Sequence, residues 1–185
     1  LKRLVDDDVE RQYMLWFQAP GVAEAVLDPR ARLVFEKLMR TGVDPVELMD
    51  RSFVDGKLHM NPFLDLDARE PAGAPVADPA TLDHDASVFE RTGFRGGINW
   101  YRNIDANSAA FPEVGTAPID IPALMICSEW DPVLSPALAA GMPQLCSDLE
   151  MHTIPKTGHW VQHEAPDQVN AVLVDWLQRR FGTSR

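Results

Sequence analysis

Residues 121–134 read IPALMICSEWDPVL, and the first seven form an unbroken apolar run of strand length. Such a run is typical of a strand that is buried on both faces of a parallel sheet. Residues 149–154 predict a second short strand, and helices are expected over 135–142 and 166–181. The order strand–helix–strand–helix is that of the end of an α/β sheet. Because two strands do not make a stable sheet alone, most of this sheet is expected to lie outside these residues.

The part of the chain that precedes this α/β segment has a different sequence pattern. Residues 4–40 predict helices that are interrupted at Pro20 and Gly21, and Asp44-Pro45 predicts the start of another helix. Residues 51–82 predict a long loop because prolines recur along it, and two short helices are expected over 83–91 and 96–102. The sequence therefore predicts a helical region over 1–112 and an α/β region over 113–185.

Composition excludes several classes of function. The chain has 185 residues, of which 17 are basic and 28 acidic, and its net charge is −11. A chain this acidic repels phosphate backbones, so nucleic-acid binding is not expected. No apolar run is long enough to cross a membrane. Cys127 and Cys146 form neither a disulfide framework nor a metal-binding spacing. We therefore expect a cytoplasmic protein that needs no metal and no cofactor.

Two residues follow the predicted strands and are candidates for catalysis. Asp131 comes just after the first strand, and His159 lies in the loop after the second. Functional groups gather at the carboxyl ends of strands in open α/β sheets, so these side chains are expected to meet. A carboxylate that holds one imidazole nitrogen leaves the other free to act as a base. The alternative is that Asp131 only caps a helix following Pro132 and that His159 only fills a turn.

Aromatic residues supply a second set of candidates. The chain has only two tyrosines, Tyr13 and Tyr101, and both lie in aromatic helical segments. Two phenols from different helices can hold one oxygen that is becoming an alkoxide, although periodicity alone favours two core tyrosines with bonded hydroxyls. Large aromatic residues near the candidates predict an apolar binding pocket or, alternatively, core packing; they are Trp16, Phe17, Trp100, Trp130 and Trp160.

A nucleophile is missing from this pattern. The sequence has no G-x-S-x-G motif, and no carboxylate or thiol occupies a comparable glycine-flanked turn after a strand. Asp55-Gly56 is the nearest candidate, but it lies in the predicted loop. Either the protein is not a hydrolase, or its nucleophile lies on polypeptide outside these residues.

Four segments resemble the soluble epoxide hydrolases of the α/β-hydrolase superfamily. They are YMLWFQAPGVAEA (13–25), GFRGGINWYRN (93–103), IPALMICSEWDPVL (121–134) and GHWVQHEAPDQVN (158–170). The resemblance covers nearly the whole chain in the same order. It implies an α/β fold in which a helical cap, residues 1–112, is followed by the last strand–helix–strand–helix units of the core, residues 113–185.

The resemblance also implies roles for the candidate residues. In the family, a carboxylate attacks an epoxide and forms an alkyl-enzyme ester, which a histidine-activated water then cleaves to give a vicinal diol. Tyr13 and Tyr101 match the tyrosines that hold and protonate the epoxide oxygen. Asp131 matches the orienting acid and His159 matches the base. The expected substrates are a small apolar epoxide and water.

The chain departs from the family in one respect. The family's nucleophilic aspartate and its oxyanion loop belong to the N-terminal half of the core, and neither is found here. We therefore expect a C-terminal portion that is inactive without the missing half. A dehalogenase of the same superfamily and a non-catalytic binding protein are the alternatives, and a homodimer stays open.

Overall fold

The computed structural model describes residues 8–54, 57–58, 60–68 and 70–182. The described chain divides into two compact units, with a boundary between Pro112 and Glu113. The first unit holds the residues up to Arg40 and those from Val46 to Pro112, and the second holds Thr41–Pro45 and the residues from Glu113 onward. The assignment of these regions to a cap and to part of a core stays a prediction.

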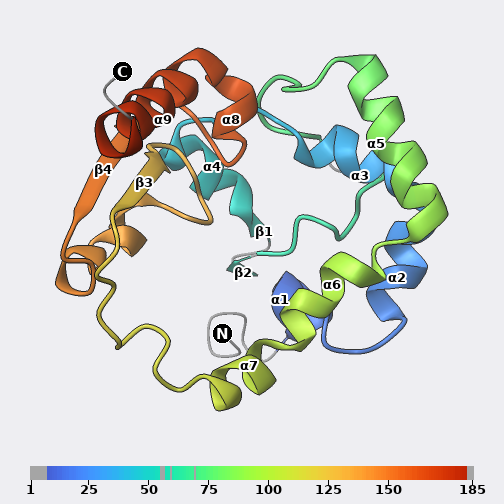
Figure 1. Cartoon of the computed structure of the whole chain (residues 1–185). Helices are drawn as coiled ribbons and strands as arrows, with labels where there is room; N and C mark the ends of the chain where they lie inside the picture. Colours follow the sequence, from blue (N-terminus) through green and yellow to red (C-terminus); the bar gives the residue numbers. More distant parts are fainter. Residues whose placement is uncertain (1–7, 55–56, 59, 69, 183–185) are drawn as a thin grey trace. The chain divides into compact units, whose positions relative to one another are not determined.

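The first unit is built mainly of short helices (Figure 1). They are α1 (Tyr13–Trp16), α2 (Val22–Leu27), α3 (Ala31–Leu38), α4 (Pro45–Ser52), α5 (Pro79–Thr92), α6 (Arg95–Arg102) and α7 (Ile104–Ala110). Single 3₁₀ turns lie at Val9–Arg11 and Asp28–Arg30, and the two-residue strands β1 (Phe53–Val54) and β2 (Lys57–Leu58) pair in antiparallel fashion. Because these elements are too short to be stable alone, tertiary packing must hold them.

The core of the first unit gathers side chains from α1, α2, α3 and α6. Its buried members are Trp16, Phe17, Ala23, Leu27, Val34, Leu66 and Ile98. Tyr13, Phe63 and Tyr101 pack against this cluster and are partly buried. Helices α3 and α5 lie side by side, with the rings of Phe35 and Phe89 at a centroid distance of 5.0 Å.

The helix boundaries after residue 78 correct two sequence expectations. Helix α5 begins at Pro79, four residues before the predicted start at 83, because the Asp78 side chain accepts hydrogen bonds from the backbone N–H groups of Ala80 and Thr81. Asp78 is thus the N-cap and Pro79 the first helical residue, a combination that favours helix initiation. Gly93 ends α5 with φ +67°, which glycine adopts without strain. Helix α7 was not predicted.

The described part of the second unit contains two strands and two α-helices. The strands β3 (Ala123–Ser128) and β4 (Leu149–Ile154) are parallel, as predicted, with Ala123 opposite Leu149 and Ser128 opposite Ile154. In β3 only Cys127 and Ser128 are fully buried, whereas the four preceding residues are half-buried. The predicted burial of the whole strand on both faces is therefore wrong for these four residues, because within the described chain β3 pairs with β4 alone.

The segment that joins the two strands does not form the predicted α-helix over 135–142. It forms two 3₁₀ turns instead, at Pro136–Ala139 and Met142–Gln144. Pro143 has no N–H to donate to a helical hydrogen bond, and Gly141 favours a helix least of the non-proline residues. These two residues explain why the turns are not joined into one helix.

Two helices follow β4, namely α8 (Val161–Glu164) and α9 (Pro166–Phe181), and α9 has the predicted bounds. Helix α9 packs against both strands (Figure 1). Trp176 is its buried side chain, whereas Leu173 and Leu177 are exposed. Arg180 forms an ion pair with Asp148, just before β4, at 2.6 Å. This contact fixes the helix beside the start of β4, at the end of the strand opposite to the His159 loop.

Candidate active site

The structure brings Asp131 and His159 together. Asp131 follows the end of β3 and His159 follows the end of β4, so the parallel pairing carries both loops to the same edge. His159 Nδ1 lies 2.9 Å from Asp131 Oδ2. With Nδ1 donating to the carboxylate, the imidazole keeps Nε2 as its free acceptor. This is the arrangement of an acid and a base that activates a nucleophile or water.

Asp131 also has a structural role, although not the predicted one of a helix cap, because residues 132–135 form no helix and the side chain holds a turn instead. Its Oδ1 atom accepts hydrogen bonds from the backbone N–H groups of Val133 and Leu134, at 2.8 and 2.9 Å. The side chain is only 7% exposed, so both oxygens have fixed partners in a largely dry environment. The two interpretations are therefore compatible, because one oxygen holds the turn and the other holds the imidazole.

Hydrogen bonds to the residues before and after His159 hold the loop that carries it. The backbone N–H of Gly158 donates to the Glu164 carboxylate at 3.0 Å, and Glu164 also accepts from the Gly42 N–H at 2.8 Å. The backbone N–H of Trp130 donates to the Thr157 carbonyl at 2.9 Å and joins the two strand-end loops. The His159 ring itself is 41% exposed, so it is held in place and yet accessible to a reactant.

Tyr13 and Tyr101 also meet, within the first unit. Tyr13 is the first residue of α1, Tyr101 lies near the end of α6, and their ring centroids are 5.5 Å apart in an edge-to-face arrangement. Partial burial, followed by the proximity of the Tyr101 hydroxyl and a hydrogen bond with it, raises the pKa of Tyr13 to about 12. At neutral pH Tyr13 is therefore protonated and available as a donor.

Helix α1 is held at its start by a residue that the sequence analysis did not single out. Gln12 is fully buried, and its Oε1 atom accepts from the backbone N–H groups of Met14 and Leu15 at 2.6 and 3.3 Å. The same side chain leaves Nε2 buried without a partner among the described residues. The hydrogen bonds of Gln12 fix the direction of α1 and, with it, the position of Tyr13.

The predicted pocket aromatics have different surroundings. Trp16 and Phe17 are 5% and 4% exposed and belong to the core of the first unit, whereas Trp100 is 76% exposed. In the second unit Trp130 and Trp160 are half-buried, and the Trp160 ring lies edge-on to His159 at 5.3 Å. Phe63, which sequence reasoning missed, packs 6.1 Å from the Tyr13 ring. Contact with a substrate stays a prediction for all five aromatic residues named in the sequence analysis.

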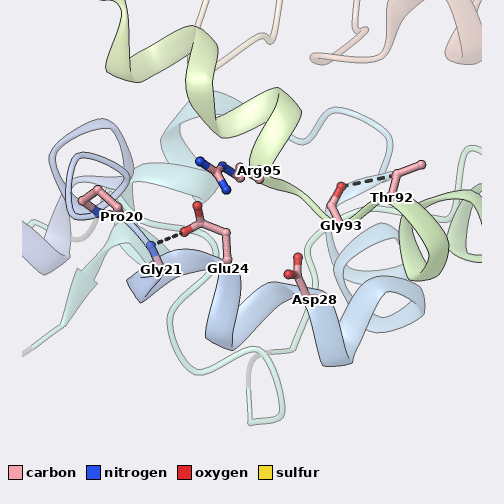
Figure 2. Close-up of a pocket in the computed structure, with 7 residues that line it drawn as sticks. All are labelled: Pro20, Gly21, Glu24, Asp28, Thr92, Gly93 and Arg95. Carbon is pink, nitrogen blue, oxygen red and sulfur yellow. Dashed lines mark hydrogen bonds between the residues drawn. The ribbon is translucent and has the colours of Figure 1, made fainter.

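A cavity of about 520 Å³ lies elsewhere in the first unit (Figure 2). It opens between α2 and the turn that joins α5 to α6, and its lining consists of Pro20, Gly21, Glu24, Asp28, Thr92, Gly93 and Arg95. Asp28 closes one side by accepting a hydrogen bond from the Phe94 N–H at 2.9 Å. None of the candidate catalytic residues lines this cavity.

The remaining chemical features of the described ranges concern metal ligands, thiols and membrane-spanning helices. No group of three or more His, Cys, Asp or Glu side chains there is arranged to hold a metal ion. Cys127 and Cys146 are both free thiols, buried in the second unit. Among the residues described, no helix combines the length and the apolar character needed to cross a membrane. Asp55 and Gly56, the nearest nucleophile candidate in the sequence, lie outside the described residues.

Comparison with known proteins gives relatives of one kind, although no family model matches the chain. Bifunctional epoxide hydrolase 2 of Rattus norvegicus is 33% identical over 166 residues, which cover 90% of this chain and 29% of the rat protein. Epoxide hydrolase A of Mycobacterium tuberculosis is 36% identical over 171 residues, which cover 89% of this chain and 51% of that protein. This chain therefore spans between 29% and 51% of the length of these two relatives.

Solved structures give the same result. Epoxide hydrolase A from Mycobacterium thermoresistibile matches with a TM-score of 0.78 and 33% identity, over 96% of this chain and 55% of that one. Potato epoxide hydrolase I matches with a TM-score of 0.72 and 28% identity, over 96% of this chain and 56% of that one.

Together with the parallel strands and the acid–histidine pair at their ends, these likenesses place the chain in the α/β-hydrolase superfamily. Within that superfamily it belongs with the epoxide hydrolases. The resemblance predicted from the four sequence segments is confirmed, and so is the fold class. The roles of individual residues stay predictions.

Proposed function

We propose that this chain forms part of an epoxide hydrolase that converts an apolar epoxide to a vicinal diol through an alkyl-enzyme ester. In this proposal, Tyr13 and Tyr101 hold and protonate the epoxide oxygen, Asp131 orients His159, and His159 activates water. A carboxylate nucleophile, expected to be an aspartate, is supplied by sequence outside these 185 residues, in the N-terminal half of the core.

The pairing of the chain's only two tyrosines carries this proposal. Two phenols that touch at 5.5 Å between ring centroids present two hydroxyls in one place. An epoxide oxygen has two lone pairs and becomes an alkoxide when its C–O bond breaks, so two donors suit it better than one. A halide leaving group, by contrast, departs as a stable anion and needs no proton. The tyrosine pair thus favours an epoxide over a haloalkane.

The first half of the proposed reaction is an alkylation. A carboxylate oxygen attacks one epoxide carbon, a new C–O ester bond forms, and the epoxide C–O bond breaks with its electron pair going to the ring oxygen. A tyrosine hydroxyl then gives its proton to that oxygen. Tyr13 holds its proton when the epoxide arrives, as an ordinary phenol does at neutral pH. Its raised pKa makes it a weaker acid, so the role rests on the position of the hydroxyl beside that of Tyr101.

The second half is hydrolysis of the ester. His159 Nε2 takes a proton from water, and the resulting hydroxide adds to the ester carbonyl. The tetrahedral intermediate expels the diol, which leaves with the proton that the hydroxide carried in, and the carboxylate is restored. The proton held by His159 then passes through water to the tyrosinate left by the alkylation step, so both side chains return to their starting states. The imidazolium formed at His159 is stabilised by the Asp131 carboxylate 2.9 Å from Nδ1. Water activation is thereby assigned to the second unit, and proton donation to the leaving oxygen is assigned to the first.

Turnover of an aryl epoxide by the complete protein tests the proposal; here the complete protein means this chain together with the sequence that supplies the nucleophile. Single turnover in ¹⁸O-labelled water is expected to leave the label on the protein, because water attacks the ester carbonyl and the diol takes its oxygen from the carboxylate. Label in the first diol released would instead indicate direct attack by water. A haloalkane turned over in place of the epoxide would indicate a dehalogenase, and turnover of neither would indicate a binding protein.

A further inference from the structure

Arg102 makes an unusually complete set of contacts next to Tyr101. Its Nε atom donates to the Phe17 carbonyl at 2.7 Å, Nη1 donates to Glu24 Oε1 at 2.6 Å, and Nη2 donates to Glu24 Oε2 at 3.0 Å. Further bonds reach Asn99 Oδ1 and the Ala19 carbonyl, both at 3.2 Å. All three guanidinium nitrogens are thus engaged, and the fork on Glu24 is bidentate, which is the strongest geometry for such a pair.

The partner carboxylate is fixed at its own end. Glu24 Oε2 accepts a hydrogen bond from the Gly21 N–H at 2.9 Å, at the start of α2. The Arg102 and Glu24 side chains are only 14% and 12% exposed, which separates this pair from the solvent-exposed ion pairs of the same unit. The Arg102 guanidinium holds the pKa of Glu24 down to about 2, so the pair is charged at every pH at which the protein would work.

These contacts connect the two helices that carry the tyrosines. Arg102 is the residue after Tyr101 on α6, and it binds the carbonyl of Phe17, the residue that follows α1. The Phe17 ring in turn lies 5.6 Å from the Tyr13 ring and 5.2 Å from the Tyr101 ring. Gln18 adds a parallel link, since its Nε2 atom donates to the Met14 carbonyl at 2.8 Å and to the Tyr101 carbonyl at 3.2 Å.

We propose that Arg102 is a positioning residue for the proton-donating tyrosines: its fork to Glu24 and its bond to the Phe17 carbonyl set the separation of Tyr13 from Tyr101. The inference rests on the proposed function in that the tyrosines must act on one oxygen for their separation to matter. Displacing an acid by about 1 Å costs as much as 10²-fold in rate. Arg102 touches no reacting atom and acts through the helices that it joins.

Lysine is not expected to replace Arg102. A lysine ammonium is a compact charge without a planar fork, so it can reach Glu24 or the Phe17 carbonyl but does not match both in the arginine geometry. The conservative variant Arg102→Lys therefore separates charge from geometry. Glu24→Gln removes the charge of the partner and keeps one oxygen acceptor, which makes it the milder disturbance of the same link.

The matched control is Arg32→Met. Arg32 joins α3 to α5 through Asp83 at 2.8 Å and contacts neither tyrosine helix in this way. The comparison set in the complete protein is Arg102→Met, Arg102→Lys, Glu24→Gln and Arg32→Met. Transient kinetics with an aryl epoxide would measure the alkylation rate and the ester-hydrolysis rate separately. ¹³C NMR of phenol-labelled tyrosine, assigned with Tyr13→Phe and Tyr101→Phe, would follow the two phenols without needing turnover.

The expected result is a fall in the alkylation rate of about 10–100-fold in Arg102→Met, with ester hydrolysis unchanged. Arg102→Lys and Glu24→Gln should give smaller losses in the same step. The Tyr13 resonance should shift and its pKa should fall toward the ordinary phenol value, while Arg32→Met matches the wild type. If Arg102→Met does not fold, Arg102→Lys and Glu24→Gln carry the test.

Three outcomes separate the inference from the proposed function. Unchanged tyrosine resonances and an unchanged alkylation rate in the Arg102 and Glu24 variants would overturn the positioning role, whatever the substrate. Equal losses in alkylation and ester hydrolysis would also overturn it, because they would indicate a general loss of structure. If the wild-type protein turns over no epoxide but the Arg102 and Glu24 variants still shift the tyrosine resonances, the link between the helices stands and the proposed function is rejected.

Discussion

The Asp131 carboxylate divides its two oxygens between the backbone and the imidazole of His159. Oδ2 lies 2.9 Å from His159 Nδ1, and Oδ1 accepts the N–H groups of Val133 and Leu134. The second pair of contacts determines which way the carboxylate faces, so the side chain reaches His159 already oriented. This division allows the acid's structural and chemical contributions to be measured apart.

The variant Asp131→Asn should keep the fold and lose the chemistry. The amide oxygen is expected to keep the two backbone N–H donors, which leaves the NH₂ group facing Nδ1. An N–H donor there favours the imidazole tautomer that is protonated at Nε2, and that tautomer cannot accept a proton from water. We expect ester hydrolysis to slow on the order of 10³–10⁴-fold. Rapid-quench kinetics of the complete protein measures this rate.

Asp131→Ala is the companion variant. It removes the backbone contacts as well, so its melting temperature should fall, whereas Asp131→Asn should melt close to the wild type. If Asp131→Asn hydrolysed the ester at the wild-type rate, the orienting role of Asp131 would be wrong.

The tyrosines should be needed for epoxides and dispensable for halides. Tyr13→Phe or Tyr101→Phe removes one hydroxyl donor and should slow alkylation by an epoxide about 10²–10³-fold. The double variant should lose measurable epoxide turnover. Steady-state assays with an aryl epoxide and with a haloalkane, run side by side, check this. Epoxide turnover retained by the double variant would remove the tyrosines from the mechanism.

Alkaline pH should destabilise the first unit through Tyr13. The pKa of Tyr13 is raised to about 12 in the folded chain, against about 10 for a free phenol. Below pH 10 both states hold the proton and the stabilisation is fully present. Between pH 10 and 12 the unfolded state releases its proton first, so the free energy of unfolding should fall as the pH rises. Urea titrations across this range measure the slope, and Tyr13→Phe should make it shallower. Equal slopes would contradict the raised pKa.

The glycine before His159 should not accept a side chain. A Cβ atom on Gly158 would lie 2.6 Å from the Gly42 Cα. That neighbour is a backbone atom, so it cannot rotate away as the end of a side chain could. Gly158→Ala should therefore destabilise the second unit by more than about 1 kcal/mol. Gly141→Ala, where a Cβ meets nothing within 4 Å, is the matched control and should be neutral or slightly stabilising. Thermal unfolding of both variants tests the difference, and equal melting temperatures would contradict the close approach.

The sequence predicted those elements whose signals are local. Strand β4 (Leu149–Ile154) and helix α9 (Pro166–Phe181) have the predicted bounds, because apolar patterning and a proline at the first helical turn mark them directly. Residues 135–142 have the composition of a helix but contain breakers, and they form 3₁₀ turns. Helix α7 has no apolar stripe, so periodicity gave no sign of it.

The part of the candidate site that depends on the order of the strands could be predicted from the sequence. Asp131 and His159 follow neighbouring parallel strands, so their meeting followed from strand-end geometry. The contact between Tyr13 and Tyr101 depends on tertiary packing of α1 against α6, which no local pattern encodes. Arg102 lies inside a segment that was singled out for its tyrosine, yet its contacts with Phe17 and Glu24 connect residues more than seventy positions apart.

The central claim is a covalent ester that His159 cleaves, and the intact mass of the complete His159→Gln protein after incubation with an aryl epoxide tests it most directly. Opening an epoxide expels no leaving group, so the account predicts a mass increase equal to the whole epoxide, stable for as long as the base is absent. Replacement of the nucleophilic carboxylate should abolish the adduct. A His159→Gln protein that carries no adduct, or that still releases diol at the wild-type rate, would contradict the account.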